Sequence, residues 1–266
     1  MGITPFLAYS RRTSEEGIVS TSERPAFGFM GSGEFLPWAE EVDRWLIEHA
    51  RTGSDRVLIL PAASAPEGDE IFDRWATMGS DHYRRMGLEP EVVTIKTRED
   101  ALMEETAELF AGAGLIFFSG GNPKYLVEVF ANTPAWRGIL EAIEAGTAFG
   151  GCSAGVAFLG DRAPDSTHVP FGPEAMRPGL AYFPGVEFAP HWDALDKYQA
   201  GLQEIVKATL TPGFVHVLVD EETAMVGDGE RFTVIGRSAI TILAGDEEHA
   251  YHAGESFSLP EAGAPA

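Results

Sequence analysis

The chain has 266 residues, which at roughly 150 residues per domain leaves one large or two small domains open. Its 19 basic and 41 acidic residues give a formal net charge of −22, which argues against a basic surface for nucleic acid or for an anionic membrane. The single cysteine, Cys152, cannot close an intrachain disulfide or supply a cysteine-rich zinc site. These features exclude a disulfide scaffold and disfavour nucleic-acid and membrane partners.

The sequence also carries no targeting signal that we recognise. Its apolar runs are much shorter than the ~20 residues of a membrane-spanning helix. The first residues lack a basic stretch followed by an apolar core, and Phe6 stands where a myristoylation signal has Ser or Thr. We therefore expect a cytoplasmic protein. Within it we expect a flexible extension over residues 1–25, a single domain over 26–258 and a loose tail over 259–266.

Apolar strands alternate with amphipathic helices along the first part of the chain. The expected strands are 26–30, 56–60, 91–95 and 114–118, and the expected helices are 38–49, 69–86, 100–111, 125–130 and 136–145. In the helix 100–111 we expect Leu102, Leu109 and Phe110 to face inward. This alternation predicts an α/β fold of the flavodoxin-like kind, with a mostly parallel sheet flanked by helices.

The last part of the chain has a different pattern. Short apolar segments at 214–219, 224–226, 231–235 and 238–243 are joined by tight turns such as Asp228-Gly229. We expect them to form a C-terminal antiparallel extension of the same sheet.

The segment 147–158 contains the pattern Gly-x-Ser-x-Gly, with Gly151, Ser153 and Gly155 in frame. In a nucleophile elbow the serine lies on a strained turn between a strand and a helix, and its neighbours must be small. A short strand precedes Ser153 and a small-residue helix is expected after it. The backbone N–H of Ala154 would then point to where an oxyanion forms. A glycine-rich turn without chemistry gives the same pattern.

Cys152 is a rival nucleophile, because glutaminase-type amidotransferases carry a cysteine in Gly-x-Cys-x-Gly. In that frame the flanking residues are Gly150 and Ala154, so the last position is not glycine, and we favour Ser153. Cys152 is then a small buried neighbour.

A nucleophilic serine needs a base and an acid that orients it. The sequence offers seven histidines: His49, His82, His168, His191, His216, His249 and His252. His191 is the best placed, because it follows the apolar strand 185–190 and the carboxyl ends of parallel strands are where binding crevices form. For the acid, the residues leave Glu221 and its neighbours in 219–224, Asp161, Asp165 and Asp193 open.

These segments together resemble the peptidase E and cyanophycinase family of serine peptidases, whose fold is similar to the class I glutamine amidotransferase domain. The resemblance extends from Phe27 to Leu243. It rests on four segments of the sequence: 117–122 (FFSGGN), 151–155 (GCSAG), 190–191 (PH) and 219–224 (VDEETA). It implies that Ser153 is the nucleophile and that His191 is the base that later protonates the leaving amine. Gly120 or Gly121, together with Ala154, would supply the oxyanion-hole N–H groups.

The resemblance gives two positions for the acid. The cyanophycinase branch has an Asp-Glu-x-Thr-Ala segment whose glutamate orients the histidine, and this matches Glu221. The peptidase E branch has an aspartate between the serine and the histidine, and the nearest equivalent here is Asp165, with His168 close to the expected position. Because His168, and not an aspartate, lies close to the position of the peptidase E acid, we favour Glu221 over Asp165.

The substrates implied by the resemblance are small aspartyl or β-aspartyl peptides, although the family's full substrate signature is not found here. Asn122 and Lys124 would face the site, and residues 31–35 either line it or form a simple turn. No cofactor or metal is expected, and a homodimer is expected from the resemblance alone. A cysteine-dependent glutaminase and a catalytically silent ligand-binding domain are the alternative hypotheses.

Overall fold

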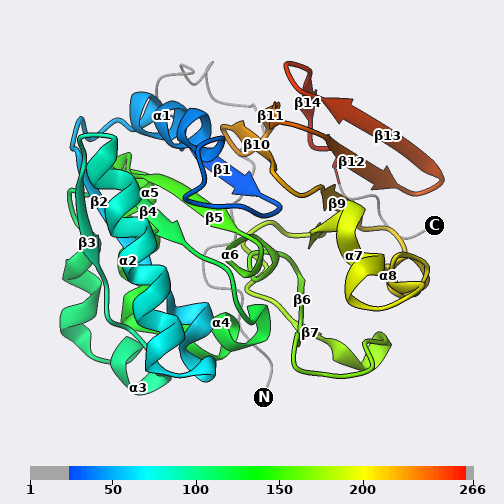
Figure 1. Cartoon of the computed structure of the whole chain (residues 1–266), viewed down its shortest axis with the longest axis horizontal. Helices are drawn as coiled ribbons and strands as arrows, with labels where there is room; N and C mark the ends of the chain where they lie inside the picture. The colour runs from blue at the N-terminus through cyan, green and yellow to red at the C-terminus, as the bar shows by residue number, and fades with distance from the viewer. Residues whose placement is uncertain (1–23, 262–266) are drawn as a thin grey trace, which may run out of the picture.

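The computed structural model describes residues 24–261 (Figure 1). Most of the extension expected at 1–25 and the end of the tail expected at 259–266 lie outside the described residues. The described helices are α1 (Ala39–His49), α2 (Asp69–Arg85), α3 (Arg98–Ala101), α4 (Pro123–Phe130), α5 (Pro134–Ala145), α6 (Ala154–Ala157), α7 (Leu195–Tyr198) and α8 (Leu202–Thr209). Short 3₁₀ helices are η2 (Ala62–Glu67), η3 (Glu104–Phe110), η4 (Pro173–Ala175) and η5 (Trp192–Ala194).

An eight-stranded sheet forms the centre of the molecule, in the order β14-β11-β10-β1-β5-β4-β2-β3. Its strands are β1 (Phe27–Met30), β2 (Arg56–Leu60), β3 (Glu89–Val92), β4 (Leu115–Phe118), β5 (Ala148–Cys152), β10 (Thr223–Gly227), β11 (Arg231–Gly236) and β14 (Ser256–Ser258). Five neighbouring strands, β1, β5, β4, β2 and β3, run parallel to one another. At the other end of the sheet, β10, β11 and β14 pair antiparallel. The α/β fold class with antiparallel C-terminal strands is therefore confirmed.

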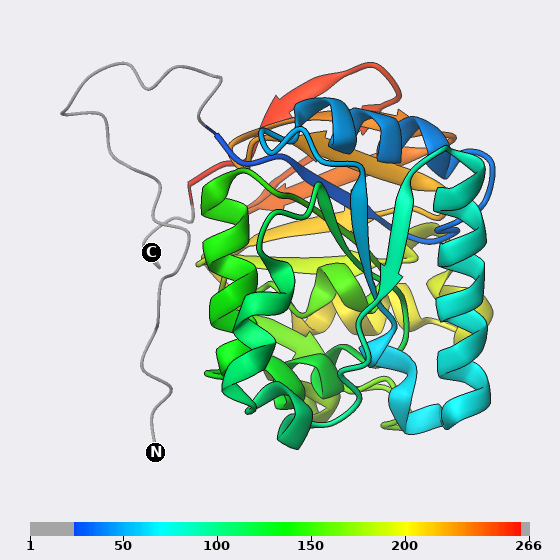
Figure 2. The same ribbon diagram turned by 90° about the vertical axis from the view of Figure 1, so that its left-hand side faces the viewer.

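Helices cover both faces of this sheet, as Figure 2 shows with α2 on one side and α4 and α5 on the other. Val42 and Leu46 of α1 are fully buried in one apolar cluster. Ile139 of α5 and Phe130 of α4 are fully buried in the other. Burial on both faces explains why the central strands are nearly continuous apolar runs.

A second, four-stranded sheet was not expected. It has the order β13-β12-β9-β8, from β8 (Val186–Pro190), β9 (Val215–Val219), β12 (Ala239–Ala244) and β13 (Glu247–His252). The prediction that all C-terminal strands extend the central sheet is thus wrong for β9 and β12 and right for β10 and β11. The pairing partners are far apart in sequence, and local apolar pattern does not specify them. A small hairpin of β6 (Arg162–Pro164) and β7 (Met176–Pro178) completes the strands of the described residues.

The single helix expected over 100–111 is also wrong. A capping box between Thr97 and Asp100 starts α3, but the chain becomes extended at Met103 and continues as η3. The Thr106 hydroxyl donates to the Met103 carbonyl at 2.6 Å, a local bond that competes with the helical pattern. Of the three side chains expected to face inward, Phe110 is buried, whereas Leu102 and Leu109 are exposed.

The register of β1, β4 and β5 brings the carboxyl ends of these three strands to the same edge of the central sheet. Met30 of β1 lies opposite Cys152 of β5, and Phe118 of β4 lies opposite Gly151. The segments that follow these strands therefore begin side by side. No helix within residues 24–261 is long and apolar enough to cross a lipid bilayer.

Candidate active site

Ser153 lies on a strained turn directly after β5. Its backbone has φ 53° and ψ −109°, unusual for a residue with a side chain, and α6 begins at the next residue. The backbone N–H of Ser153 donates to the Met30 carbonyl at 3.0 Å, which ties the turn to β1. The strand, turn and helix expected around Ser153 are all present, although α6 is only four residues long.

Gly151 and Gly155 leave no room for a side chain on either side of Ser153. A Cβ atom added to Gly151 would lie 2.1 Å from the Gly155 carbonyl oxygen. One added to Gly155 would lie 2.3 Å from the Phe118 carbonyl oxygen. The Gly-x-Ser-x-Gly pattern therefore reflects backbone packing around the serine.

His191 follows β8 and points at this serine. It has φ 58° and lies where β8 gives way to η5. Its Nε2 atom is 2.7 Å from Ser153 Oγ, and 25% of its side chain is exposed. The Tyr198 ring packs edge-on against the imidazole, with 5.8 Å between ring centroids.

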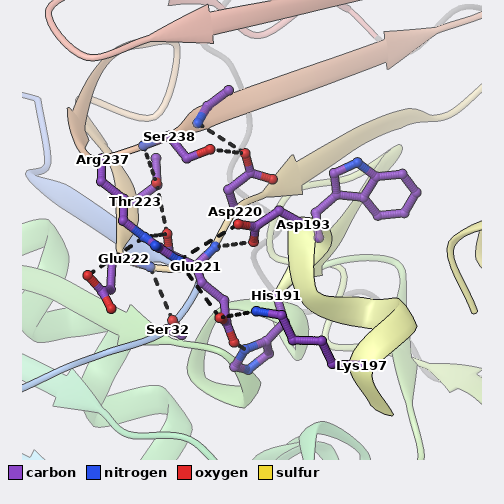
Figure 3. Close-up of polar contacts among 12 residues, drawn as sticks. Ser32, His191, Asp193, Lys197, Asp220, Glu221, Glu222, Thr223, Arg237 and Ser238 are labelled. Carbon is purple, nitrogen blue, oxygen red and sulfur yellow. Dashed lines mark hydrogen bonds and ion pairs between the residues drawn. The ribbon is translucent and has the colours of Figure 1, made fainter. Parts of the chain in front are cut away.

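Glu221 follows β9 and lies on the other side of the imidazole. Its Oε1 atom is 3.4 Å from Nδ1 of His191. The Asp193 carboxylate accepts the Glu221 backbone N–H at 2.8 Å, so the residues after β8 and β9 are tied together. Lys197 Nζ and an Arg237 guanidinium nitrogen lie 3.6 and 3.9 Å from Glu221 Oε2 (Figure 3).

Asp165 does not lie beside His191. Its carboxylate accepts hydrogen bonds from the Thr167 hydroxyl at 2.7 Å and from the Asn122 amide at 3.2 Å. Lys124 Nζ is 3.7 Å from its other oxygen. The Thr167 hydroxyl in particular, with Asn122 and the positive charge of Lys124, lowers the pKa of Asp165 to about 2. Asn122 and Lys124 are thus engaged with Asp165 at the start of α4.

The remaining histidines are held elsewhere in the fold. His82 is buried against Asp43, with 2.7 Å between Nε2 and Oδ2, and His216 is buried near Glu187. His49 stacks on Trp45, and His168 and His249 lie near Glu174 and Glu247. His252 is exposed at the end of β13. Among residues 24–261, no group of three or more His, Cys, Asp or Glu side chains is arranged to hold a metal ion.

The Gly120-Gly121 turn after β4 lies next to the serine. A Cβ atom on Gly120 would be 3.9 Å from Ser153 Oγ. The Gly120 N–H donates to Oε1 of the buried Glu34 at 2.8 Å, so it is already satisfied. Of the two glycines expected to supply an oxyanion-hole N–H, Gly121 is the one left for that role beside Ala154. Residues 31–35 were expected either to line the site or to form a simple turn, and no signal in the sequence singles out Glu34.

Cys152 is fully buried, and its side-chain hydrogen-bond partner is Glu34. Its thiol lies 2.9 Å from Glu34 Oε2. Burial and the nearby negative charge of Glu34 raise the pKa of the Cys152 thiol well above its usual value. It is therefore a poor source of a thiolate.

The sequence model of peptidase family S51 matches residues 29–235, which include Ser153, His191 and Glu221. The chain belongs to peptidase family S51. It is a peptidase, as family membership shows, and the expected resemblance to peptidase E is confirmed. No curated protein sequence matches the chain.

Several solved structures are similar to this one, and two of them illustrate the likeness. A crystal structure of a peptidase from an acI-B1 actinobacterium is 30% identical, with a TM-score of 0.79 over 90% of this chain and 98% of that one. A structure described as a candidate peptidase E protein from Listeria monocytogenes EGD-e is 20% identical, with a TM-score of 0.59 over 81% of this chain and 100% of the other. At 20% identity, the second comparison shows a shared fold and no more.

Proposed function

We propose that this chain is a serine peptidase that cleaves small aspartyl or β-aspartyl peptides through an acyl-enzyme. The observation that carries the proposal is the 2.7 Å contact between Ser153 Oγ and His191 Nε2, on a strained elbow, in a member of a peptidase family. A serine hydroxyl becomes a competent nucleophile when a neighbouring base accepts its proton.

The first half of the reaction forms an ester. Ser153 Oγ bonds to the substrate carbonyl carbon while its proton passes to His191 Nε2, and the carbonyl electron pair moves onto oxygen. Glu221 holds the protonated imidazole through Nδ1, and the N–H groups of Gly121 and Ala154 stabilise the oxyanion. The carbon–nitrogen bond then breaks, and His191 gives its proton to the leaving amine.

The second half hydrolyses that ester. Water bonds to the acyl carbon as His191 accepts one of its protons. The new tetrahedral species collapses, the carbon–oxygen bond to Ser153 breaks, and the serine oxygen takes the proton back from His191. The enzyme returns to its starting state with one water consumed and a carboxylic acid released.

The substrate class rests on the resemblance and on charge. In a chain with a formal net charge of −22, Lys197 and Arg237 lie within 4 Å of Glu221 Oε2. Basic side chains at the site favour a substrate that carries its own carboxylate. The proposal also includes a cytoplasmic location, a homodimer and no requirement for a cofactor.

The cysteine-dependent alternative receives no support from the geometry. The Cys152 thiol faces Glu34, is inaccessible and has a raised pKa. The silent-domain alternative requires that the contact between Ser153 and His191 has no chemical consequence, which activity measurements decide.

The proposal is tested with matched dipeptides that share one leaving residue and begin with α-Asp, β-Asp, Asn or Ala, in buffer with EDTA. We expect release of the amino acid from one or both aspartyl peptides and little from the Asn and Ala peptides, with no activity in Ser153→Ala. A burst of amine release ahead of the acid would show the acyl-enzyme. Equal cleavage of the Asn and Asp peptides would contradict the substrate class, and cleavage by Ser153→Ala would contradict the mechanism.

A further inference from the structure

Glu34 is a buried carboxylate that the proposed reaction does not use. Its residue is only 5% exposed, and burying a carboxyl group is costly unless its oxygens are hydrogen-bonded. Each oxygen has one partner: Oε1 accepts the Gly120 N–H at 2.8 Å, and Oε2 contacts the Cys152 thiol at 2.9 Å. These partners belong to the two segments that must meet for catalysis.

The backbone that carries Glu34 is fixed on both sides. Before it, the Gly31 N–H donates to the Thr223 carbonyl at 2.9 Å. After it, Phe35 adopts φ 65°, and its ring packs against Phe117 with 5.3 Å between ring centroids. Glu34 therefore presents its carboxylate from a rigid turn at the end of β1.

The Gly120-Gly121 turn is held by backbone bonds on its other flanks. The Ser119 N–H donates to the Leu60 carbonyl at 3.3 Å, and the Asn122 N–H donates to the Ala63 carbonyl at 2.9 Å. Between them, the Gly120 N–H reaches Glu34. This bond fixes the Ser119–Gly120 peptide group, which directly precedes the Gly120–Gly121 peptide group that carries the Gly121 N–H, an expected oxyanion donor.

We propose that Glu34 is a positioning residue that sets the Gly120-Gly121 turn against the nucleophile Ser153. One oxygen holds the turn, and the other holds the residue directly before the serine. The inference rests on the proposed function, because it concerns stabilisation of the oxyanion in that reaction. The hydrogen-bond partners of Glu34 are Gly120 and Cys152, and neither Ser153 nor His191 is among them.

The test measures phosphonylation of the protein by a fluorophosphonate, which converts Ser153 into a tetrahedral adduct resembling the oxyanion. The limiting rate and the half-saturating concentration are determined for the parent, Glu34→Gln, Glu34→Asp, Glu34→Ala and Cys152→Ala. Glutamine keeps an oxygen that can accept the Gly120 N–H. Aspartate keeps the negative charge, but its side chain is one methylene group shorter and its oxygens no longer reach the Gly120 N–H. Cys152→Ala removes the other contact and leaves the turn held.

Removing one oxyanion-hole donor costs about a hundredfold or more in rate, so a misaligned donor should cost about tenfold. We expect a drop of about tenfold or more in the limiting rate for Glu34→Asp and Glu34→Ala, with the half-saturating concentration nearly unchanged. Glu34→Gln and Cys152→Ala should stay within about threefold of the parent. Melting temperatures identify any variant that fails to fold. If Glu34→Ala fails to fold, the limiting rates of Glu34→Gln and Glu34→Asp decide whether the hydrogen bond to Gly120 positions the turn.

Two results would overturn the inference. Equal limiting rates for the parent, Glu34→Asp and Glu34→Ala would show that the carboxylate does not position the turn. An equal loss in Glu34→Gln and Glu34→Ala would assign the effect to charge and not to the hydrogen bond. If the parent is not labelled at all, the proposed function fails and this inference with it.

Discussion

His191 and Glu221 leave the carboxyl ends of two neighbouring parallel strands, and their side chains meet at 3.4 Å between Nδ1 and Oε1. The register pairs Pro190 of β8 with Val219 of β9, so the two residues emerge at the same edge of the second sheet. The Asp193 carboxylate, one turn after His191, holds the Glu221 backbone. This geometry supports the proposal that Glu221, and not Asp165, orients the imidazole.

The two acids give the first prediction. Glu221→Gln should reduce kcat by about a hundredfold or more, because the imidazole loses the carboxylate that fixes its tautomer and stabilises its charge. Asp165→Asn, the matched variant, should leave kcat within about threefold. Steady-state kinetics on the best dipeptide measure both. A larger loss in Asp165→Asn than in Glu221→Gln would reverse the assignment of the acid.

Asp165 gives a second prediction, on stability against pH. Its folded pKa of about 2 lies below its ordinary value of 3.8, so the folded state favours the ionised carboxylate. The resulting stabilisation is present above about pH 4 and is lost as the pH falls towards 2. It is worth at most about 2.5 kcal/mol, and less after solvent screening.

The measurement is urea unfolding at pH 5, 4, 3 and 2.5 for the parent and Asp165→Asn. The parent should lose more free energy of unfolding over this range than the variant does. Parallel losses in the two proteins would show that the hydrogen bonds to Thr167 and Asn122 contribute nothing to this pH dependence.

Cys152 gives a third prediction, on thiol reactivity. Because the thiol is buried and its pKa is raised well above the usual value, the native protein should resist iodoacetamide at pH 8. After unfolding in urea the same cysteine should be alkylated readily. Intact mass measures both. Fast alkylation of the native protein with matching loss of peptidase activity would support the cysteine as nucleophile.

The elbow glycines give a fourth prediction. Gly155→Ala should destabilise the fold by about 1–3 kcal/mol, since the new methyl group meets the Phe118 carbonyl at 2.3 Å and backbone must shift. Gly172→Ala is a matched control, because its methyl group meets only the end of the Glu174 side chain. Unfolding midpoints in urea compare the two. Similar midpoints would show that the elbow has room for a side chain.

Much of the fold could be predicted because its signals are local. The strands at 27–30, 56–60 and 115–118 are short apolar runs bounded by glycine or proline, and the structure has them within a residue or two. The elbow could be found for the same reason, since its glycines and serine are adjacent in sequence. Likewise, the end of the apolar strand 185–190 pointed to His191, whereas the residues alone left the acid open and Glu221 was favoured by the resemblance.

What could not be predicted depends on partners distant in sequence. Pairing of β9 with β8 and β12 makes a second sheet, and no local pattern distinguishes this from pairing with β10. Glu34 is one of 41 acidic residues, and only its burial against Gly120 and Cys152, 86 and 118 positions away, sets it apart. For the acid, the resemblance favoured Glu221 over Asp165, and the structure adds the contact of Glu221 with His191 Nδ1 at 3.4 Å.

The most direct test of the central claim, that His191 activates Ser153 as a nucleophile, is intact-protein mass after treatment with a fluorophosphonate. The parent, Ser153→Ala and His191→Ala are compared, with circular dichroism to show that each is folded. We expect one adduct on the parent, mapped to Ser153 by peptide mass, and none on either variant. A folded parent that takes up no reagent, or labelling that persists in Ser153→Ala, would contradict the account.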